Sequence, residues 1–303
     1  MGEFISILPG QRARMVWMLP WVVAGAASCG QATALSGSLR VVDDAGDTVG
    51  VAAPARRIAS LIPATTELLF AIGAGDAVVG RTAWCDYPAA AAAVPNLGDG
   101  IGPSLEAILS VRPDLVLLYN SSRNGETATR LRQAGIPSLL LNTDALADVG
   151  RIARLLGRVS GRQREADSVA AAFDTALAAA TVPAGGNAPK VLLLVWEQPP
   201  MTVGRGSFLS ELVERAGGRN LFDDVAASAG AVSIEAVATR DPDLILTASE
   251  GPAAFISRPE WQVVRAVRER RLLQVGGSEF NRPGPRAPAA IREITGRLRV
   301  VAR

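Results

Sequence analysis

The sequence of 303 residues contains no histidine, and its single lysine is Lys190. Without histidine the chain lacks the usual general base of Ser-His and Cys-His enzymes and the commonest protein ligand of metal ions. No glycine-rich loop precedes Lys190, so the sequence predicts no phosphate-binding P-loop, and neither G-x-G-x-x-G nor G-x-S-x-G occurs. We therefore predict that the protein is not an enzyme and has no catalytic residues, resident cofactor or metal site.

The sequence also has little excess of charge of either sign, and it contains few cysteines. The 31 basic and 29 acidic residues give a formal net charge of +2 and are interleaved, so we expect no nucleic-acid partner. The two cysteines are Cys29 and Cys85. If Cys29 is removed or acylated during export, Cys85 has no partner for a disulfide. Cys85 is then expected to be a small buried residue, because no base is available to activate its thiol.

Residues 1–37 have the pattern of an export leader followed by a tether. Arg12 and Arg14 precede an apolar run over residues 15–27, and Ala26-Ala27-Ser28-Cys29 resembles a bacterial lipoprotein box without its first leucine. We predict export, with lipidation of Cys29 and simple cleavage as the two outcomes. A permanent membrane anchor is a third alternative, but the run is short for a span. The expected location is therefore periplasmic or membrane-anchored.

Two segments of the chain repeat each other. Residues 104–118 and 233–246 both read as a capping serine, an acidic first turn, an apolar helix, a Pro-Asp turn and a buried strand. Short strands and helices alternate around both copies, which is typical of a mainly parallel sheet covered on both faces. We predict an α/β fold with an N-terminal lobe over residues 38–159 and a C-terminal lobe over residues 183–303.

Residues 160–182 are predicted to form one long helix that connects the lobes. Ser160 and Gln163 fit a capping box, and the following apolar residues recur at helical spacing. Such a helix is about 30 Å long and would hold the lobes at a fixed distance. A preceding helix is expected over residues 144–156, ended by Gly157, and residues 39–51 are expected to form a β-hairpin outside the core.

Ligands of open α/β sheets bind beyond the carboxyl ends of the strands, and the few aromatic residues of this chain concentrate there. This placement favours a large, flat, partly apolar ligand between the lobes, with loop arginines for a carboxylate or phosphate. Packing of the aromatic rings and solvation of the arginines are the alternatives. The candidate ligand-binding residues are Pro63, Thr65, Trp84, Tyr87, Tyr119, Trp196, Arg205, Phe280 and Arg282.

Glu106 and Glu235 occupy equivalent positions in the two repeats. An acid in the first turn of a helix ordinarily stabilises the helix by about 0.3–1 kcal/mol. Their matched occurrence suggests a second role, in which two separated acids dock to basic sockets on a partner.

From residue 39 onward the chain resembles the helix-spine class of periplasmic substrate-binding proteins, which deliver cobalamin, haem or ferric siderophores to ABC importers. The resemblance rests on residues 57–67, the Cys85-Asp86-Tyr87-Pro88 loop, both Ser-x-Glu-Ala repeats and residues 214–222. It implies a monomer whose lobes clasp a ligand with little closure. It also implies that Glu106 and Glu235 dock to arginines of the permease.

The loop over residues 84–88 and the segment over residues 63–67 look most like the cobalamin-binding branch, so cobalamin is the expected ligand. Residues 98–102 lack the tryptophan that some cobalamin binders carry there. The absence of histidine and of a Tyr-Tyr pair argues against ligation of haem iron. A ferric siderophore or haem on the same scaffold is the alternative, with Arg205 and Arg282 as siderophore contacts. A two-lobed enzyme using the same cleft is a third hypothesis.

Overall fold

The computed structural model describes residues 37–183, 185–225, 229–247 and 253–301. The predicted leader, including Cys29, lies outside these residues. Among the helices that are described, none combines the length and the apolar character needed to cross a bilayer.

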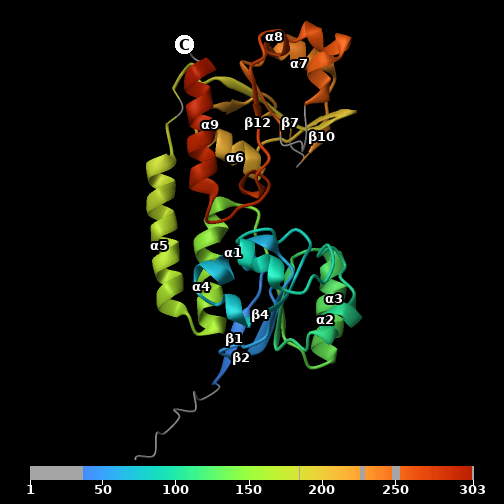
Figure 1. Cartoon of the computed structure of the whole chain (residues 1–303), viewed down its shortest axis with the longest axis vertical. Coiled ribbons are helices and arrows are strands. Elements are labelled where there is room, and N and C mark those ends of the chain that lie inside the picture. Colours follow the sequence, from blue (N-terminus) through green and yellow to red (C-terminus); the bar gives the residue numbers. More distant parts are fainter. Residues whose placement is uncertain (1–36, 184, 226–228, 248–252, 302–303) are drawn as a thin grey trace, which may run out of the picture. The chain divides into compact units, whose positions relative to one another are not determined.

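The first half is built on a sheet of four parallel strands in the order β4-β3-β5-β6 (Figure 1). These strands are β3 (Ile58–Ser60), β4 (Val78–Arg81), β5 (Leu115–Tyr119) and β6 (Ser138–Leu141). The helices are α1 (Pro63–Ala71), α2 (Leu105–Ser110), α3 (Ser122–Gln133) and α4 (Leu146–Ser160), with 3-10 turns η1 (Gly75–Ala77) and η2 (Ala89–Ala93).

Alternation along β5 shows how this sheet is buried on both faces. Leu115 and Leu117 belong to the core cluster that contains residues of α1 and α4. Val116 and Leu118 belong to a separate cluster with residues of α2 and α3. All four side chains are fully buried, because successive residues of a strand point to opposite faces and helices cover both.

The second half contains a separate sheet in the order β10-β8-β7-β11-β12, with β9 also paired to β7. Strands β9, β11 and β12 run parallel to their neighbours, whereas β8 and β10 are antiparallel. The strands are β7 (Lys190–Glu197), β8 (Pro200–Thr202), β9 (Arg219–Asn220), β10 (Gly230–Ala231), β11 (Leu244–Thr247) and β12 (Leu272–Gln274). The prediction of two mainly parallel sheets is confirmed.

Helices cover this second sheet on both faces as well (Figure 1). On one face lie α6 (Phe208–Arg215) and α9 (Ala287–Val301), and on the other α7 (Ile234–Arg240) and α8 (Arg265–Arg268). Three 3-10 turns complete the half: η3 (Ala254–Ser257), η4 (Pro259–Val263) and η5 (Ser278–Phe280).

The predicted single connecting helix is wrong at its beginning. Ser160 is the last residue of α4 and does not cap a new helix: its Oγ donates to the carbonyl of Leu156 at 2.7 Å. Gly161 ends α4 in the left-handed conformation, with φ at 73°, and α5 begins at Gln163 and ends at Ala180. The chain therefore turns back at Gly161, and α5 packs against both α4 and α9 (Figure 1).

Gly157 does not end a helix either, because it lies inside α4, against the first residues of α5 and the turn before it. A Cβ atom built on Gly157 would lie 2.4 Å from Cβ of Ala166 and 2.9 Å from the carbonyl oxygen of Arg162. Real carbon atoms do not approach so closely, and one neighbour is backbone that cannot move aside. The absence of a side chain at Gly157 is therefore what allows α4 and α5 to pack at this distance.

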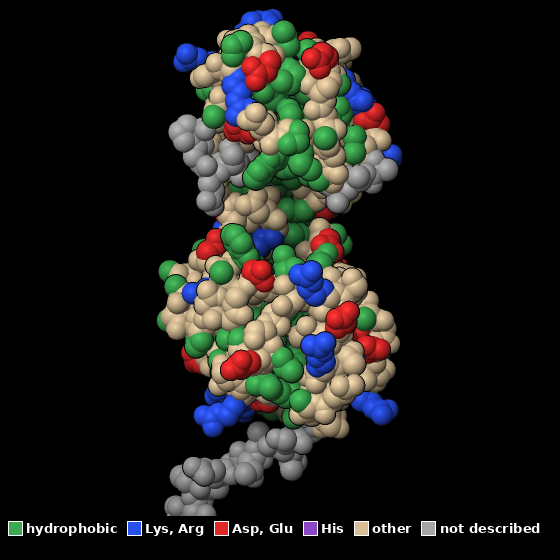
Figure 2. Space-filling view, turned by 90° about the vertical axis from the view of Figure 1, so that its right-hand side faces the viewer, with side chains coloured by type: hydrophobic (Ala, Val, Ile, Leu, Met, Phe, Trp, Pro, Cys, Tyr) green, Lys and Arg blue, Asp and Glu red, His purple; other side chains and the backbone are tan. Residues whose placement is uncertain are grey.

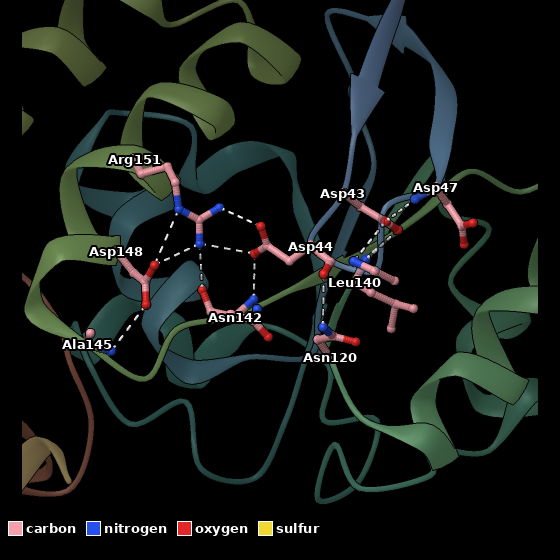
Figure 3. Close-up of polar contacts among 10 residues, drawn as sticks. Asp43, Asp44, Asp47, Asn120, Leu140, Asn142, Ala145, Asp148 and Arg151 are labelled. Atoms are coloured by element: carbon pink, nitrogen blue, oxygen red, sulfur yellow. Dashed lines mark hydrogen bonds and ion pairs between the residues drawn. The ribbon is translucent and has the colours of Figure 1, made fainter. Parts of the chain in front are cut away.

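The hairpin of β1 (Gly37–Val42) and β2 (Thr48–Ala53) forms as predicted, but it is not outside the core. Val41, Val49 and Val51 are buried in the main cluster. Its turn is anchored by aspartates (Figure 3). Asp43, whose side chain is fully buried, accepts from Arg132 Nη2 at 2.8 Å and from the Leu140 amide at 3.2 Å.

Asp44 anchors the same turn to the start of α4. It accepts two hydrogen bonds from Arg151, at 2.7 and 3.0 Å, and one from the amide of Asn142 at 2.6 Å (Figure 3). Arg151 also donates to Asp148 at 2.8 Å. The hairpin is thus joined to the sheet by apolar packing and by charge-assisted hydrogen bonds, which are among the stronger polar contacts in proteins.

The close approach at Gly157 predicts that Gly157→Ala lowers the free energy of unfolding by about 1–3 kcal/mol, because the methyl group forces α4 from Ala166. Gly150 is a matched control in α4. A Cβ there lies 3.7 Å from Ala170 and 3.3 Å from the flexible end of Arg154. Gly150→Ala should be neutral or stabilising by up to about 1 kcal/mol. Urea unfolding of both variants measures this, and equal effects would contradict the packing argument.

Candidate ligand-binding site

A cavity of about 870 Å³ lies between the carboxyl ends of the two sheets. Figure 2 shows the surface hollowed between the two halves, with apolar side chains gathered at the hollow. The first half contributes Leu61, Ile62, Pro63, Ala64, Trp84, Asp86, Asp99, Gly100, Ile101, Tyr119, Ser121, Asn124, Thr143 and Asp144. The second half contributes Gly206, Ser207, Phe208, Gly276, Ser278, Asn281, Arg282 and Pro283.

The topology explains why these residues meet. Pro63 follows β3, Trp84 follows β4, Tyr119 ends β5 and Asp144 follows β6, all at the carboxyl edge of the first sheet. Arg282 follows β12 of the second sheet, beyond η5. Parallel strands bring such positions to one edge, where open α/β folds bind their ligands.

The wall of the cavity is largely apolar, with exposed aromatic and aliphatic side chains. Trp84 is 62% exposed, Ile101 65% and Tyr119 37%. Exposed apolar side chains gathered in a concave site, rather than scattered singly, mark a surface that binds another molecule.

Arg282 spans from the second half to the first. Its Nη1 donates to the carbonyl of Trp84 at 2.7 Å, and its Nη2 pairs with Oδ1 of Asp86. Burial by itself raises the pKa of Asp86, but the hydrogen bond and positive charge of Arg282 lower that pKa below its ordinary value. Asp86 is therefore ionised at neutral pH, and the pair is a salt bridge.

Tyr119 and Asp144 form a second polar pair in the wall. The Tyr119 hydroxyl donates to Oδ1 of Asp144 at 2.9 Å. Burial and this carboxylate both raise the pKa of Tyr119 above its ordinary value. The hydroxyl is therefore held by a carboxylate that opposes its ionisation, which disfavours its use as a phenolate ligand of iron.

A more deeply buried pair joins the halves beside the cavity. Arg286 donates to both carboxylate oxygens of Glu67, at 3.0 and 3.1 Å, while the Glu67 side chain is only 3% exposed. The same guanidinium donates to Ser278 at 2.7 Å, pairs with Glu279 and lies 4.1 Å from the centre of the Tyr87 ring. Burial lowers the pKa of Arg286, but Glu67 and Glu279 outweigh burial and raise it.

The structure brings four of the predicted ligand-binding residues into the cavity wall, namely Pro63, Trp84, Tyr119 and Arg282. Thr65 and Phe280 do not line it. Thr65 is fully buried, and its Oγ1 lies 2.7 Å from Ser60 Oγ and donates to the carbonyl of Ile62. Phe280 is 3% exposed because its ring packs into the main apolar core.

Tyr87, Trp196 and Arg205 are also outside the described lining of the cavity. Tyr87 stacks beneath Arg286. Trp196 is 61% exposed near the carboxyl end of β7, where its indole donates to the carbonyl of Gln198 at 2.8 Å. Arg205 is exposed in the turn before α6. Ligand contact by Trp196 and Arg205 stays a prediction.

Several lining residues were not predicted. Asp99 and Gly100 belong to the long loop after β4, and Gly100 has φ at 83°. A Cβ atom on Gly100 would lie 2.8 Å from the carbonyl oxygen of Leu61, so this loop reaches the cavity only through a glycine. Asp144 is the third residue after β6, a position that the strand-end argument could have included, and Ser207 directly precedes α6.

Glu106 and Glu235 are exposed in the first turns of α2 and α7. The capping serines form as predicted, since Ser104 Oγ accepts from the Ala107 amide at 3.3 Å and Ser233 Oγ from the Ala236 amide at 3.1 Å. Hydrogen bonds from its own amide and from Ser233 lower the pKa of Glu235. Both acids are therefore placed at the surface of their own half.

Cys85 is buried, with 1% of its surface exposed. Its sulfur lies 3.1 Å from Thr66 Oγ1 and 3.2 Å from Thr82 Oγ1. The prediction of a small buried residue is confirmed.

Another cavity, of about 720 Å³, lies near the amino end of β7 and includes Lys190, Arg219 and Asp223 in its wall. Its charged groups largely bond within the protein: Arg219 pairs with Asp223 at 3.2 Å, and Lys190 Nζ donates to the carbonyl of Arg240 at 2.6 Å. This second cavity lies at the amino end of β7, whereas sheets of this kind bind ligands at the carboxyl ends of their strands.

Comparison with known proteins gives a family match and sequence relatives that agree with it. A family model described as periplasmic binding protein matches residues 58–277. A vitamin B12-binding protein of Vibrio parahaemolyticus is 29% identical over 80% of this chain and 88% of its own length. An uncharacterised ABC transporter substrate-binding lipoprotein of Bacillus subtilis is 28% identical over 84% of this chain and 83% of its own length.

Solved structures of periplasmic binding proteins also resemble this chain. The periplasmic vitamin B12-binding protein of Vibrio cholerae superposes with a TM-score of 0.71 and 26% identity, covering 82% of this chain and 99% of that one. A periplasmic heme-binding protein of Roseiflexus sp. RS-1 superposes with a TM-score of 0.74 and 26% identity over the same shares.

The buried pair between the halves predicts that Glu67→Gln lowers the free energy of unfolding by about 1–3 kcal/mol, because Arg286 loses a charged partner where water cannot replace it. Glu279→Gln is the matched control: it affects the same guanidinium, but the Glu279 side chain is 25% exposed. We expect a loss below about 1 kcal/mol for that variant. Urea unfolding at neutral pH compares them, and equal losses would show that burial does not decide the effect.

Proposed function

The chain belongs to the periplasmic binding protein family, and from this premise we propose that it carries a corrinoid, most simply cobalamin, to the permease of an ABC importer. The observation that supports this most directly is the cavity of about 870 Å³ between the two halves. This volume lies in the upper part of the usual range for small-molecule pockets, about 300–1,000 Å³. Relatives named as vitamin B12-binding proteins match most of the chain.

The polar groups of the cavity favour a neutral ligand that carries amide donors. Among the described lining residues, Asp86, Asp99 and Asp144 supply three carboxylates and Arg282 supplies a guanidinium, which is already paired. The corrin ring of cobalamin bears peripheral amides, whose N–H groups can donate to carboxylates, and an apolar face that suits Trp84. Haem, which carries two carboxylates, and the ferric siderophores that bind iron through catecholate or carboxylate groups are negatively charged, and these carboxylates repel them.

Haem or a ferric siderophore on the same scaffold is the alternative, supported by the heme-binding structural relative. Haem ligation by Tyr119 is disfavoured because its hydroxyl is engaged by Asp144 and its pKa is raised. An enzymatic role in the same cleft has less support still, since the relatives reported above are named as binding proteins or as a substrate-binding lipoprotein.

The relatives support a site of action outside the cytoplasm, and a lipoprotein is among them. We extend the proposal to export by the leader over residues 1–37 and to anchoring through a lipid on Cys29, both outside the described residues. The protein is proposed to act as a monomer that docks to the permease through Glu106 and Glu235.

The corrinoid proposal predicts that purified mature protein retains cyanocobalamin after desalting, seen as visible absorbance, and does not retain ferric siderophores. Trp84→Ala should weaken cyanocobalamin binding about tenfold or more, the usual effect of removing an aromatic contact. Val263→Ala, which removes an exposed apolar side chain in η4, is the control and should change nothing. A colourless protein would contradict the proposal.

Trp196→Ala belongs in the same titration. A loss as large as that of Trp84→Ala would place Trp196 in the bound complex.

The docking proposal predicts that Glu106→Arg combined with Glu235→Arg abolishes uptake of cyanocobalamin by cells, while the affinity of the purified protein stays near normal. Charge reversal at both acids would repel arginines of the permease. Asp76→Arg combined with Glu293→Arg makes the same charge change at exposed acids, one in each half, and should leave uptake intact. A loss of affinity in the first double variant would mean that the two acids act on the ligand instead.

A further inference from the structure

The charged residues in the described wall of the cavity are unevenly distributed. Asp86, Asp99 and Asp144 contribute carboxylates, and Arg282 contributes the guanidinium. Two of the carboxylates bind within their own half: Asp99 accepts from the Ile101 amide at 2.8 Å and Asp144 from the Tyr119 hydroxyl. Asp86 differs, because its partner is the arginine.

The position of Arg282 would suit an anion-binding residue. It reaches from the second half into the cavity wall, and its side chain is 16% exposed. Its Nη1 is held by the carbonyl of Trp84, and its Nε has no hydrogen-bond partner among the described residues. A guanidinium with unused donors in a partly dry site normally attracts carboxylates or phosphates strongly.

Asp86 already supplies the anion that Arg282 binds. Its carboxylate pairs with Nη2, and its own side chain is 57% exposed, so it lies at the solvent side of the arginine. An anionic ligand that approached Arg282 would have to displace this carboxylate and would be repelled by Asp99 and Asp144 as well.

We infer that Asp86 is a specificity-determining residue that withholds Arg282 from ligands and so excludes anionic metal complexes from the cavity. The inference deepens the proposed function, because it explains how a site on this scaffold discriminates between a neutral corrinoid and an anionic haem or siderophore. Discrimination of this kind depends on repelling the wrong ligand as much as on attracting the right one.

Asp86→Asn tests this. The amide keeps the shape of the side chain and can still accept from Nη2, but it leaves the charge of Arg282 uncompensated. We expect the dissociation constant for hemin, which carries two carboxylates, to fall on the order of tenfold relative to its value for the wild-type protein. The gain should shrink as ionic strength rises, because salt screens exposed charges.

Asp99→Asn is the matched control, since it removes the same charge from the same cavity but leaves Arg282 paired. Its gain in hemin affinity should be clearly smaller. Asp86→Asn combined with Arg282→Gln should lose the gain, which a double-mutant cycle measures directly. Melting temperatures of all variants establish that each is folded.

Failure of the two proposals can be told apart. Wild-type protein that does not retain cyanocobalamin overturns the corrinoid proposal, whereas the hemin titrations need no cobalamin and still decide the role of Asp86. If Asp86→Asn gains no hemin affinity, or if Asp99→Asn gains as much, the inference is overturned. A gain that persists without the arginine overturns the role assigned to Arg282.

Discussion

The packing of α5 against α4 of the first half and α9 of the second is the constraint on which the rest of the structure depends. One apolar cluster contains Leu156 of α4, Phe173 of α5 and Ile294 of α9, and extends from the first sheet to the second. Because the halves share this cluster, moving them apart would expose apolar surface, at about 25 cal/mol for each Å². The cavity is therefore bounded by two sheets that a common core holds in place, which is consistent with a ligand clasped with little closure.

Much of the fold could be predicted because local and tertiary signals agree. The cap, helix, Pro-Asp turn and strand expected within residues 104–118 are found as Ser104, α2 (Leu105–Ser110) and β5 (Leu115–Tyr119). The signals conflict at Ser160, Gly161 and Gln163. The same residues there fit either a capping box that begins a helix or the end of a preceding helix. Gly157 has the pattern of a helix end, although it lies inside α4 and allows the close contact with Ala166. Only the approach of α5 separates these interpretations, and it is not visible in a local pattern.

The site could be predicted only in outline, for a similar reason. The edge of the sheet follows from topology, so Trp84, Tyr119 and Arg282 could be expected in the cavity wall, where the structure has them. Whether a residue after a strand points into the cavity or into the core depends on the path of its loop, and Thr65 and Phe280 turn inward. The carboxylates of Asp99 and Asp144 escaped notice because isolated acids in loops usually lie at the solvated surface.

The segment between η5 and α9 supplies two arginines that the sequence does not distinguish, and burial assigns them different roles. Arg286 meets Glu67, a carboxylate that is 3% exposed and bonded at both oxygens, so breaking this pair would leave the charge of Glu67 buried and without the arginine that neutralises it. Arg282 meets Asp86, which is 57% exposed and can exchange its partner for water at little cost. The first pair therefore fixes the two halves, whereas the second can respond to the charge of whatever enters the cavity. A structural contact and a selective one can thus arise four residues apart, because only one of the two carboxylates is removed from water.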